Sequence, residues 1–78
     1  MAIKVAVYQI PRHKRSTICC KSMVAGIRVT GDHATLFNET DYTGPHSDVA
    51  VFYGYTRTLR RVMTDYVAAW RKAVYIDL

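Results

Sequence analysis

The chain has 78 residues, a length that allows one domain over residues 1–78 with only a small hydrophobic core. Hydrophobic residues make up 50% of it and charged residues 22%, which excludes a disordered chain, and no apolar run approaches the roughly 20 residues that cross a bilayer. The net charge of +5 favours negatively charged partners such as phosphates, nucleic acid or an acidic protein surface.

The N-terminal segment and the cysteines indicate a reducing compartment. Residues 1–10 are too short an apolar segment, and one interrupted by Lys4, to be a signal peptide. Cys19 and Cys20 are adjacent, and neighbouring cysteines reach disulfide geometry only under strain. We therefore expect a cytoplasmic protein with free thiols.

The first half of the chain predicts a strand, a helix and a second strand. Residues 3–9 are almost all apolar and rich in β-branched types, as in a parallel strand buried on both faces. Ser16 or Thr17 is the expected N-cap of a helix that ends near Gly31, and residues 33–38 form the next strand. The apolar residues of this helix recur at helical spacing: Cys19, Cys20, Met23, Val24 and Ile27.

The second half predicts a strand at residues 49–54, a helix capped by Thr56 and a last strand at residues 73–78. A polar connection with the turn pair Gly44-Pro45 precedes the strand at residues 49–54. The apolar face of this helix is predicted to contain Leu59, Val62, Met63, Tyr66, Val67 and Trp70.

This order of elements predicts an α/β fold with a small four-stranded parallel sheet. If the second and third strands lie on opposite sides of the first, right-handed crossovers place one helix on each face and the strand order is 2-1-3-4, a half-Rossmann or flavodoxin-like arrangement. The strand order reverses between the first and third strands, and open α/β sheets bind ligands outside the carboxyl ends of strands at such a switch point.

Two basic loops are predicted to meet at this switch point. Each leads into a helix N-terminus, where unpaired N–H groups favour anions and where cations are locally unfavourable to the helix. The predicted ligand- or partner-binding residues are Arg12, His13, Lys14, Arg15, Ser16, Thr17, Tyr53, Gly54, Tyr55, Thr56, Arg57, Arg60 and Arg61. A featureless solvated loop and a solvated helix surface remain the alternatives.

The two loops carry no familiar nucleotide motif. The single glycine of residues 53–56 cannot make a Gly-x-Gly-x-x-Gly fingerprint, and the phosphate loop of ATP-binding proteins is missing. Tyr53 and Tyr55 flank Gly54 and either stack on a base or pack against the neighbouring loop.

Neither a metal site nor a catalytic site is expected, and no cofactor is called for. The three histidines lack ligand spacing, and only His13 and His46 are predicted to approach the same edge. Asp77 follows the last strand, where it either contacts a ribose hydroxyl or simply ends the chain.

The sequence resembles the N-terminal, Rossmann-like part of poorly characterised bacteriophage proteins of glycosyltransferase type. The residues that carry the resemblance are Val49 to Gly54, the pair Asp65-Tyr66, and Lys72 to Leu78, with a similar Pro-Arg-His loop after the first strand. It implies a phage origin and a nucleotide-handling ancestry. Those relatives continue into a second domain that completes the active site, so no transferase activity is expected of residues 1–78.

The expected function is a small non-catalytic binding protein in the cytoplasm of a phage-infected host cell. It would act as an inhibitor by docking its basic edge on a host nucleic-acid-handling or defence protein. A nucleotide- or phosphate-binding module is the alternative, and nucleic acid is a further partner class. The last strand lies at the sheet edge, where Val74, Tyr75 and Ile76 could pair with a second copy to form a homodimer.

Overall fold

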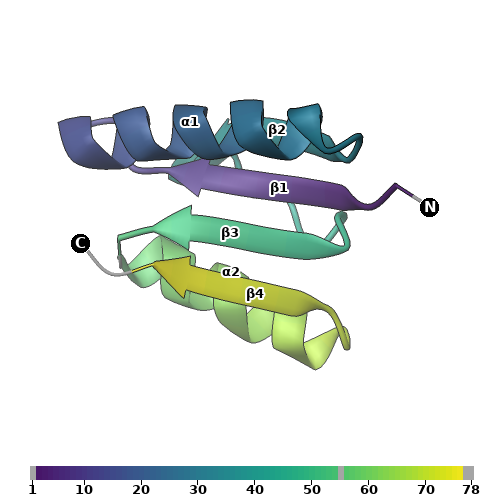
Figure 1. Ribbon diagram of the computed structural model, residues 1–78. Helices are drawn as coiled ribbons and strands as arrows, with labels where there is room; N and C mark the ends of the chain where they lie inside the picture. The colour runs from purple at the N-terminus through teal and green to yellow at the C-terminus, as the bar shows by residue number, and fades with distance from the viewer. Residues whose placement is uncertain (1, 55, 77–78) are drawn as a thin grey trace.

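The computed structural model describes residues 2–54 and 56–76, which form a four-stranded sheet with a helix on each face (Figure 1). The elements are β1 (Lys4–Gln9), α1 (Lys14–Val29), β2 (His33–Asn38), the 3-10 turn η1 (Glu39–Asp41), β3 (Val49–Tyr53), α2 (Arg57–Ala68) and β4 (Lys72–Ile76).

The sheet is parallel throughout, in the order β2-β1-β3-β4, which confirms the predicted fold class and strand order. Val5 of β1 pairs with Ala34 on one side and Val49 on the other. The carboxyl ends of β1 and β3 therefore lie side by side with their loops at the same edge, as in half of a doubly wound, Rossmann-like sheet.

Alternation along the strands divides the core into two layers. On the α1 face, Val5 and Val7 pack with Cys20, Val24 and Ala34. The successive residues of β1 point to opposite faces because the side-chain period of a strand is two.

The α2 face holds the larger layer. Tyr8 and Phe52 from the sheet pack with Leu59, Val62 and Tyr66 of the helix, and all five are completely buried. The helical spacing that predicted this face is therefore confirmed for the first three turns of α2.

Helix α1 begins earlier than the sequence predicts. Its N-cap is His13, whose Nδ1 accepts a hydrogen bond from the Ser16 N–H at 3.4 Å, so the expected caps Ser16 and Thr17 lie inside the first turn. At the other end Gly31 has φ 92°, which confirms the predicted glycine terminus.

Helix α2 starts at the predicted cap but ends before the predicted face does. Thr56 Oγ1 accepts from the Leu59 N–H at 3.2 Å. The prediction that Val67 and Trp70 belong to the apolar face is wrong: they are 62% and 97% exposed. Trp70 lies beyond the end of the helix at Ala68, and Val67 is in its last turn but is not covered by the sheet.

The last strand, β4, lies at the edge of the sheet, as expected. Val74 is 45% exposed, while Tyr75 stacks on Phe52 with ring centroids 5.9 Å apart. Within the described ranges, no helix is long and apolar enough to cross a membrane.

Candidate functional site

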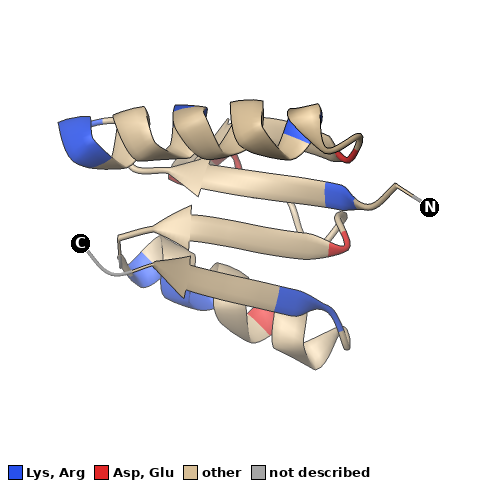
Figure 2. Cartoon of the chain, in the orientation of Figure 1, with Lys and Arg blue, Asp and Glu red and all other residues tan. Residues whose placement is uncertain are grey.

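The exposed cations at the carboxyl edge of the sheet form the candidate site. We call this group, Arg12, Lys14, Arg15, Arg57, Arg60 and Arg61, the basic edge; all six residues are exposed. Figure 2 shows Lys and Arg at the first turns of both helices, which start from the same edge of the sheet. The structure therefore brings the two predicted basic loops together.

No acidic residue occupies the first turn of either helix. The cations there repel the positive end of the helix dipole, which lowers the stability of the helix by on the order of 0.3–1 kcal/mol per charge. An external anion at this edge would attract both the cations and the positive ends of the helix dipoles, and so offset that cost.

Ser16 occupies the crevice between the two loops, but it serves the fold. Its side chain is completely buried, and its hydroxyl donates to the Tyr53 carbonyl oxygen at 2.9 Å and accepts from the Ile10 N–H at 3.1 Å. Ser16 therefore joins the loop after β1 to the end of β3. Its proton and one lone pair are engaged and the side chain is completely buried, so it does not reach a ligand at the surface.

Glu39 is the functional-site residue that sequence reasoning missed. Its carboxylate is almost completely buried, with Oε1 2.7 Å from Arg12 Nη1 and Oε2 2.5 Å from Thr56 Oγ1. Arg12 extends from the loop after β1, Glu39 follows β2, and Thr56 caps α2, so one carboxylate connects three segments. Its signal in the sequence was only its position directly after the second predicted strand.

A hollow of about 470 Å³ opens beside this carboxylate. It is lined by Glu39, Thr40, Tyr42, Arg57, Thr58 and Arg61. Arg57 and Arg61 are one helical turn apart and share its wall with Thr40 and Thr58.

The cations of the basic edge differ in how far they are neutralised. Arg12 is paired with Glu39, and Arg61 Nε lies 3.8 Å from the Asp65 carboxylate. Tyr42 also donates to that carboxylate, at 2.7 Å. Among the described residues, no acidic partner contacts the remaining four members: Lys14, Arg15, Arg57 and Arg60.

The other predicted site residues have mainly local contacts. Thr17 Oγ1 donates to the His13 carbonyl oxygen at 3.2 Å. The Tyr53 side chain packs with the α1-face core, which favours the packing alternative over base stacking. Gly54 has φ 98° and donates its N–H to the Ile76 carbonyl oxygen at 3.0 Å, so it serves the turn that leaves β3. Tyr55 lies outside the described residues.

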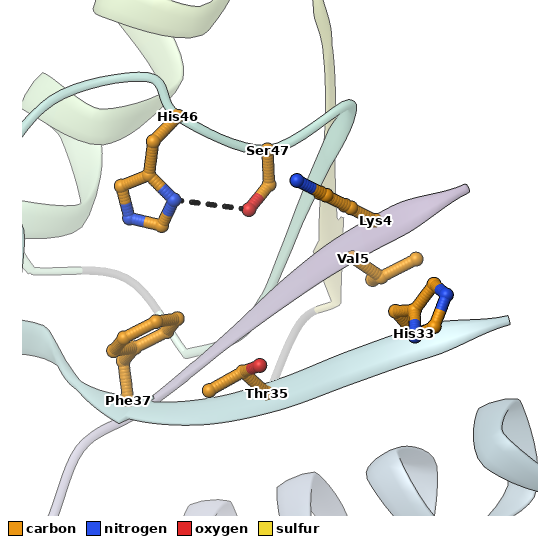
Figure 3. A pocket seen from close by; sticks show the side chains of 7 residues that line it. All are labelled: Lys4, Val5, His33, Thr35, Phe37, His46 and Ser47. Atoms are coloured by element: carbon orange, nitrogen blue, oxygen red, sulfur yellow. Dashed lines mark hydrogen bonds between the residues drawn. The ribbon is translucent and has the colours of Figure 1, made fainter. Parts of the chain in front are cut away.

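His46 does not approach His13, contrary to the sequence prediction. It lies with Lys4, His33, Thr35 and Ser47 around a second hollow on the β1–β2 part of the α2 face (Figure 3). Its ring packs edge-on against Phe37 with ring centroids 5.4 Å apart, and its Nδ1 lies 3.1 Å from Ser47 Oγ. The connection after η1 carries His46 away from the carboxyl edge, so the histidines do not converge there. In the described part of the chain, no group of three or more His, Cys, Asp or Glu side chains is placed to hold a metal ion.

Comparisons with protein-family models, with curated proteins and with solved structures find no match to this chain.

Proposed function

We propose that this chain is a non-catalytic binding protein that docks its basic edge on an acidic protein surface. The observation that carries the proposal is a set of four cations at two adjacent helix N-termini that have no acidic partner among residues 2–54 and 56–76: Lys14, Arg15, Arg57 and Arg60. Cations at this end of a helix are unfavourable in the free protein. A carboxylate-rich partner converts that unfavourable interaction into a favourable one and gives electrostatic steering during association.

The interior of the crevice favours a broad contact over a small enclosed ligand. Its centre holds the occupied hydroxyl of Ser16 and the negative charge of Glu39. A phosphate that entered there would approach a buried carboxylate. The free guanidinium and ammonium groups lie instead on the exposed rim, where a protein surface can reach several of them at once.

The resemblance to bacteriophage proteins supports the choice of a host partner. On that basis we take the chain to act in the host cytoplasm as an inhibitor of a nucleic-acid-handling or defence protein. Binding alone suffices for such a role, and no catalytic step is required of the basic edge.

A nucleotide- or phosphate-binding role is the second candidate. It is favoured by the hollow beside Glu39, where Arg57, Arg61, Thr40 and Thr58 supply cationic and hydroxyl donors. This candidate predicts that ATP raises the melting temperature, and that the rise is lost in Arg57→Ala.

The test measures binding of a fluorescein-labelled peptide of about 20 glutamates by anisotropy at low salt. The double variant Arg57→Ala/Arg60→Ala is compared with Lys21→Ala/Arg28→Gln, which removes the same charge from exposed residues outside the basic edge. We expect the first variant to bind about tenfold more weakly and the control to lose much less. Equal losses in the two variants would contradict a localised site, and a melting shift by ATP without peptide binding would favour the second candidate.

A further inference from the structure

The opposite edge of the sheet carries an exposed tryptophan in a backbone conformation that disfavours it. Trp70, the only tryptophan in the sequence, is 97% exposed and has φ 61°. It is also the one residue other than glycine with positive φ in the described ranges.

This conformation belongs to the end of α2. The Trp70 N–H donates to the Val67 carbonyl oxygen at 3.1 Å, and the Arg71 N–H donates to the Tyr66 carbonyl oxygen at 2.9 Å. These two bonds make a Schellman ending, in which the left-handed position usually holds glycine. Helix α1 follows that preference with Gly31 at the equivalent place. The fold gains little apolar burial from the indole of Trp70, yet it bears the cost of a left-handed non-glycine residue.

Cations lie along the same amino edge of the sheet as this indole. Arg71 and Lys72 follow Trp70 directly, and Lys4 begins β1. Asp48 lies between the two strands in the sheet: its N–H donates to the Lys4 carbonyl oxygen at 2.9 Å, and its own carbonyl oxygen accepts from the Lys72 N–H at 3.4 Å. Lys4 and Lys72 are therefore placed on either side of the start of β3. Figure 2 shows Lys or Arg at the starts of both β1 and β4.

Two charged side chains at this edge, Asp48 and Arg71, form hydrogen bonds with the backbone. The Asp48 carboxylate accepts the Lys4 backbone N–H at 2.8 Å, and Arg71 Nη1 donates to the Ser47 carbonyl oxygen at 2.7 Å. Arg71 thereby holds the segment after Trp70 against the loop before β3. A hollow of about 580 Å³ lies beside the indole, lined by Ile3, Asp48, Val49, Trp70, Arg71 and Lys72.

We propose that this amino edge is a binding site for single-stranded nucleic acid, with a base stacked on Trp70 and phosphates contacting Lys72 and Lys4. A flat exposed aromatic face beside cations is the combination that binds single strands without reading their sequence. The flanking charge favours this class over an apolar protein segment, which would bring no anion to Lys72 and Lys4. The site is separate from the basic edge, because Trp70 lies at the amino end of β4 and the basic edge at the carboxyl ends.

The single tryptophan makes the proposal directly measurable. Titration with an oligothymidylate of about 15 nucleotides should quench the Trp70 fluorescence, because a stacked base quenches the indole. Anisotropy of a labelled oligothymidylate then compares variants: Trp70→Ala should weaken binding about tenfold or more, Trp70→Phe should retain part of it, and Lys72→Ala should reduce the salt dependence. The charge-matched control is Lys21→Ala, on the exposed side of α1.

Two results would overturn the proposal. One is oligothymidylate binding that leaves the fluorescence of Trp70 unchanged and is equally strong in Trp70→Ala. The other is quenching by the glutamate peptide but not by oligothymidylate, which would indicate that Trp70 and the amino edge bind an acidic protein partner. Arg57→Ala/Arg60→Ala should leave the quenching largely intact, so failure here and failure at the basic edge are separable.

Discussion

Arg12 and Glu39 form an asymmetric ion pair: their side chains are 2.7 Å apart, and the arginine is 71% exposed while the glutamate is 4% exposed. The carboxylate is also the hydrogen-bond acceptor of Thr56, the N-cap of α2. The pair therefore lies where the loops after β1 and β3 and the end of β2 meet. The buried residue, Glu39, links the loop after β1 to the N-cap of α2, and the exposed residue, Arg12, belongs to the basic edge.

This asymmetry predicts unequal effects of substitution at the two residues. Glu39→Gln should lower the free energy of unfolding by about 1–2 kcal/mol, because the buried amide has one acceptor oxygen where the carboxylate has two, so either the Arg12 or the Thr56 donor loses its acceptor. Arg12→Ala should cost less than about 1 kcal/mol, since the guanidinium is largely in solvent. Urea denaturation followed by circular dichroism measures both values. A larger loss in Arg12→Ala would show that the exposed arginine, and not the carboxylate, holds the loops together.

The two adjacent cysteines should react at very different rates. Cys20 is completely buried with its Sγ 3.5 Å from the Tyr8 carbonyl oxygen, and burial raises the pKa of its thiol, whereas Cys19 is partly exposed. Since the thiolate is the reactive form, Ellman's reagent near pH 8 should titrate Cys19 quickly and Cys20 only as the protein unfolds.

The matched variant for this experiment is Cys19→Ser, which should show almost no fast thiol in the native state and one in denaturant. Equally fast reaction of both thiols in the native wild type would contradict the burial of Cys20.

Stability should fall at alkaline pH because of two tyrosines. Burial raises the pKa of Tyr8 and of Tyr42, and the hydrogen bond that Tyr42 donates to Asp65 raises the pKa of Tyr42 further. The folded state therefore holds these protons more tightly than the unfolded chain, whose tyrosines titrate near about pH 10. Their contribution is fully present below that value and is lost as the pH rises above it.

Urea midpoints measured from about pH 8 to pH 11 test this dependence. Tyr42→Phe should be less stable than wild type near neutral pH, because it loses the bond to Asp65, and its midpoint should decline less steeply above pH 10. A parallel decline in both proteins would assign the alkaline effect to other groups.

Trp70→Gly should make the protein more stable, by on the order of 1 kcal/mol, since it relieves the left-handed backbone and removes a side chain that is almost fully exposed. Trp70→Ala is the control, because it removes the indole but retains the unfavourable conformation. Thermal and urea unfolding compare the two. If Trp70→Gly were no more stable than Trp70→Ala, the left-handed backbone at position 70 would not cost the fold the stability expected here.

The sequence predicted the elements of this fold because the relevant signals are local. The apolar strands, the cap at Thr56 and the glycine at position 31 are each visible within a few residues. The strand order also required the assumption that the second and third strands flank the first, and handedness then places one helix on each face.

The errors arose where distant segments meet. Ser16 looked like a loop hydroxyl because nothing near it in sequence reveals that the Tyr53 carbonyl oxygen lies 2.9 Å away. Glu39 looked like part of a solvated connection, and only the fold brings Arg12 and Thr56 to its carboxylate. Trp70 matched the helical spacing, but the helix ends two residues before it, which turns its ring to solvent. The cations of the basic edge were predictable because exposed charges at helix starts need no distant partner.

Amide chemical-shift mapping with the glutamate peptide tests the central claim most directly, because it locates the contact on the chain. Binding to the basic edge predicts the largest shifts at residues 12–15 and 57–61, weakening as salt is added and reduced in Arg57→Ala/Arg60→Ala. The largest shifts at residues 70–72, or small shifts spread evenly over all exposed lysines and arginines, would contradict it.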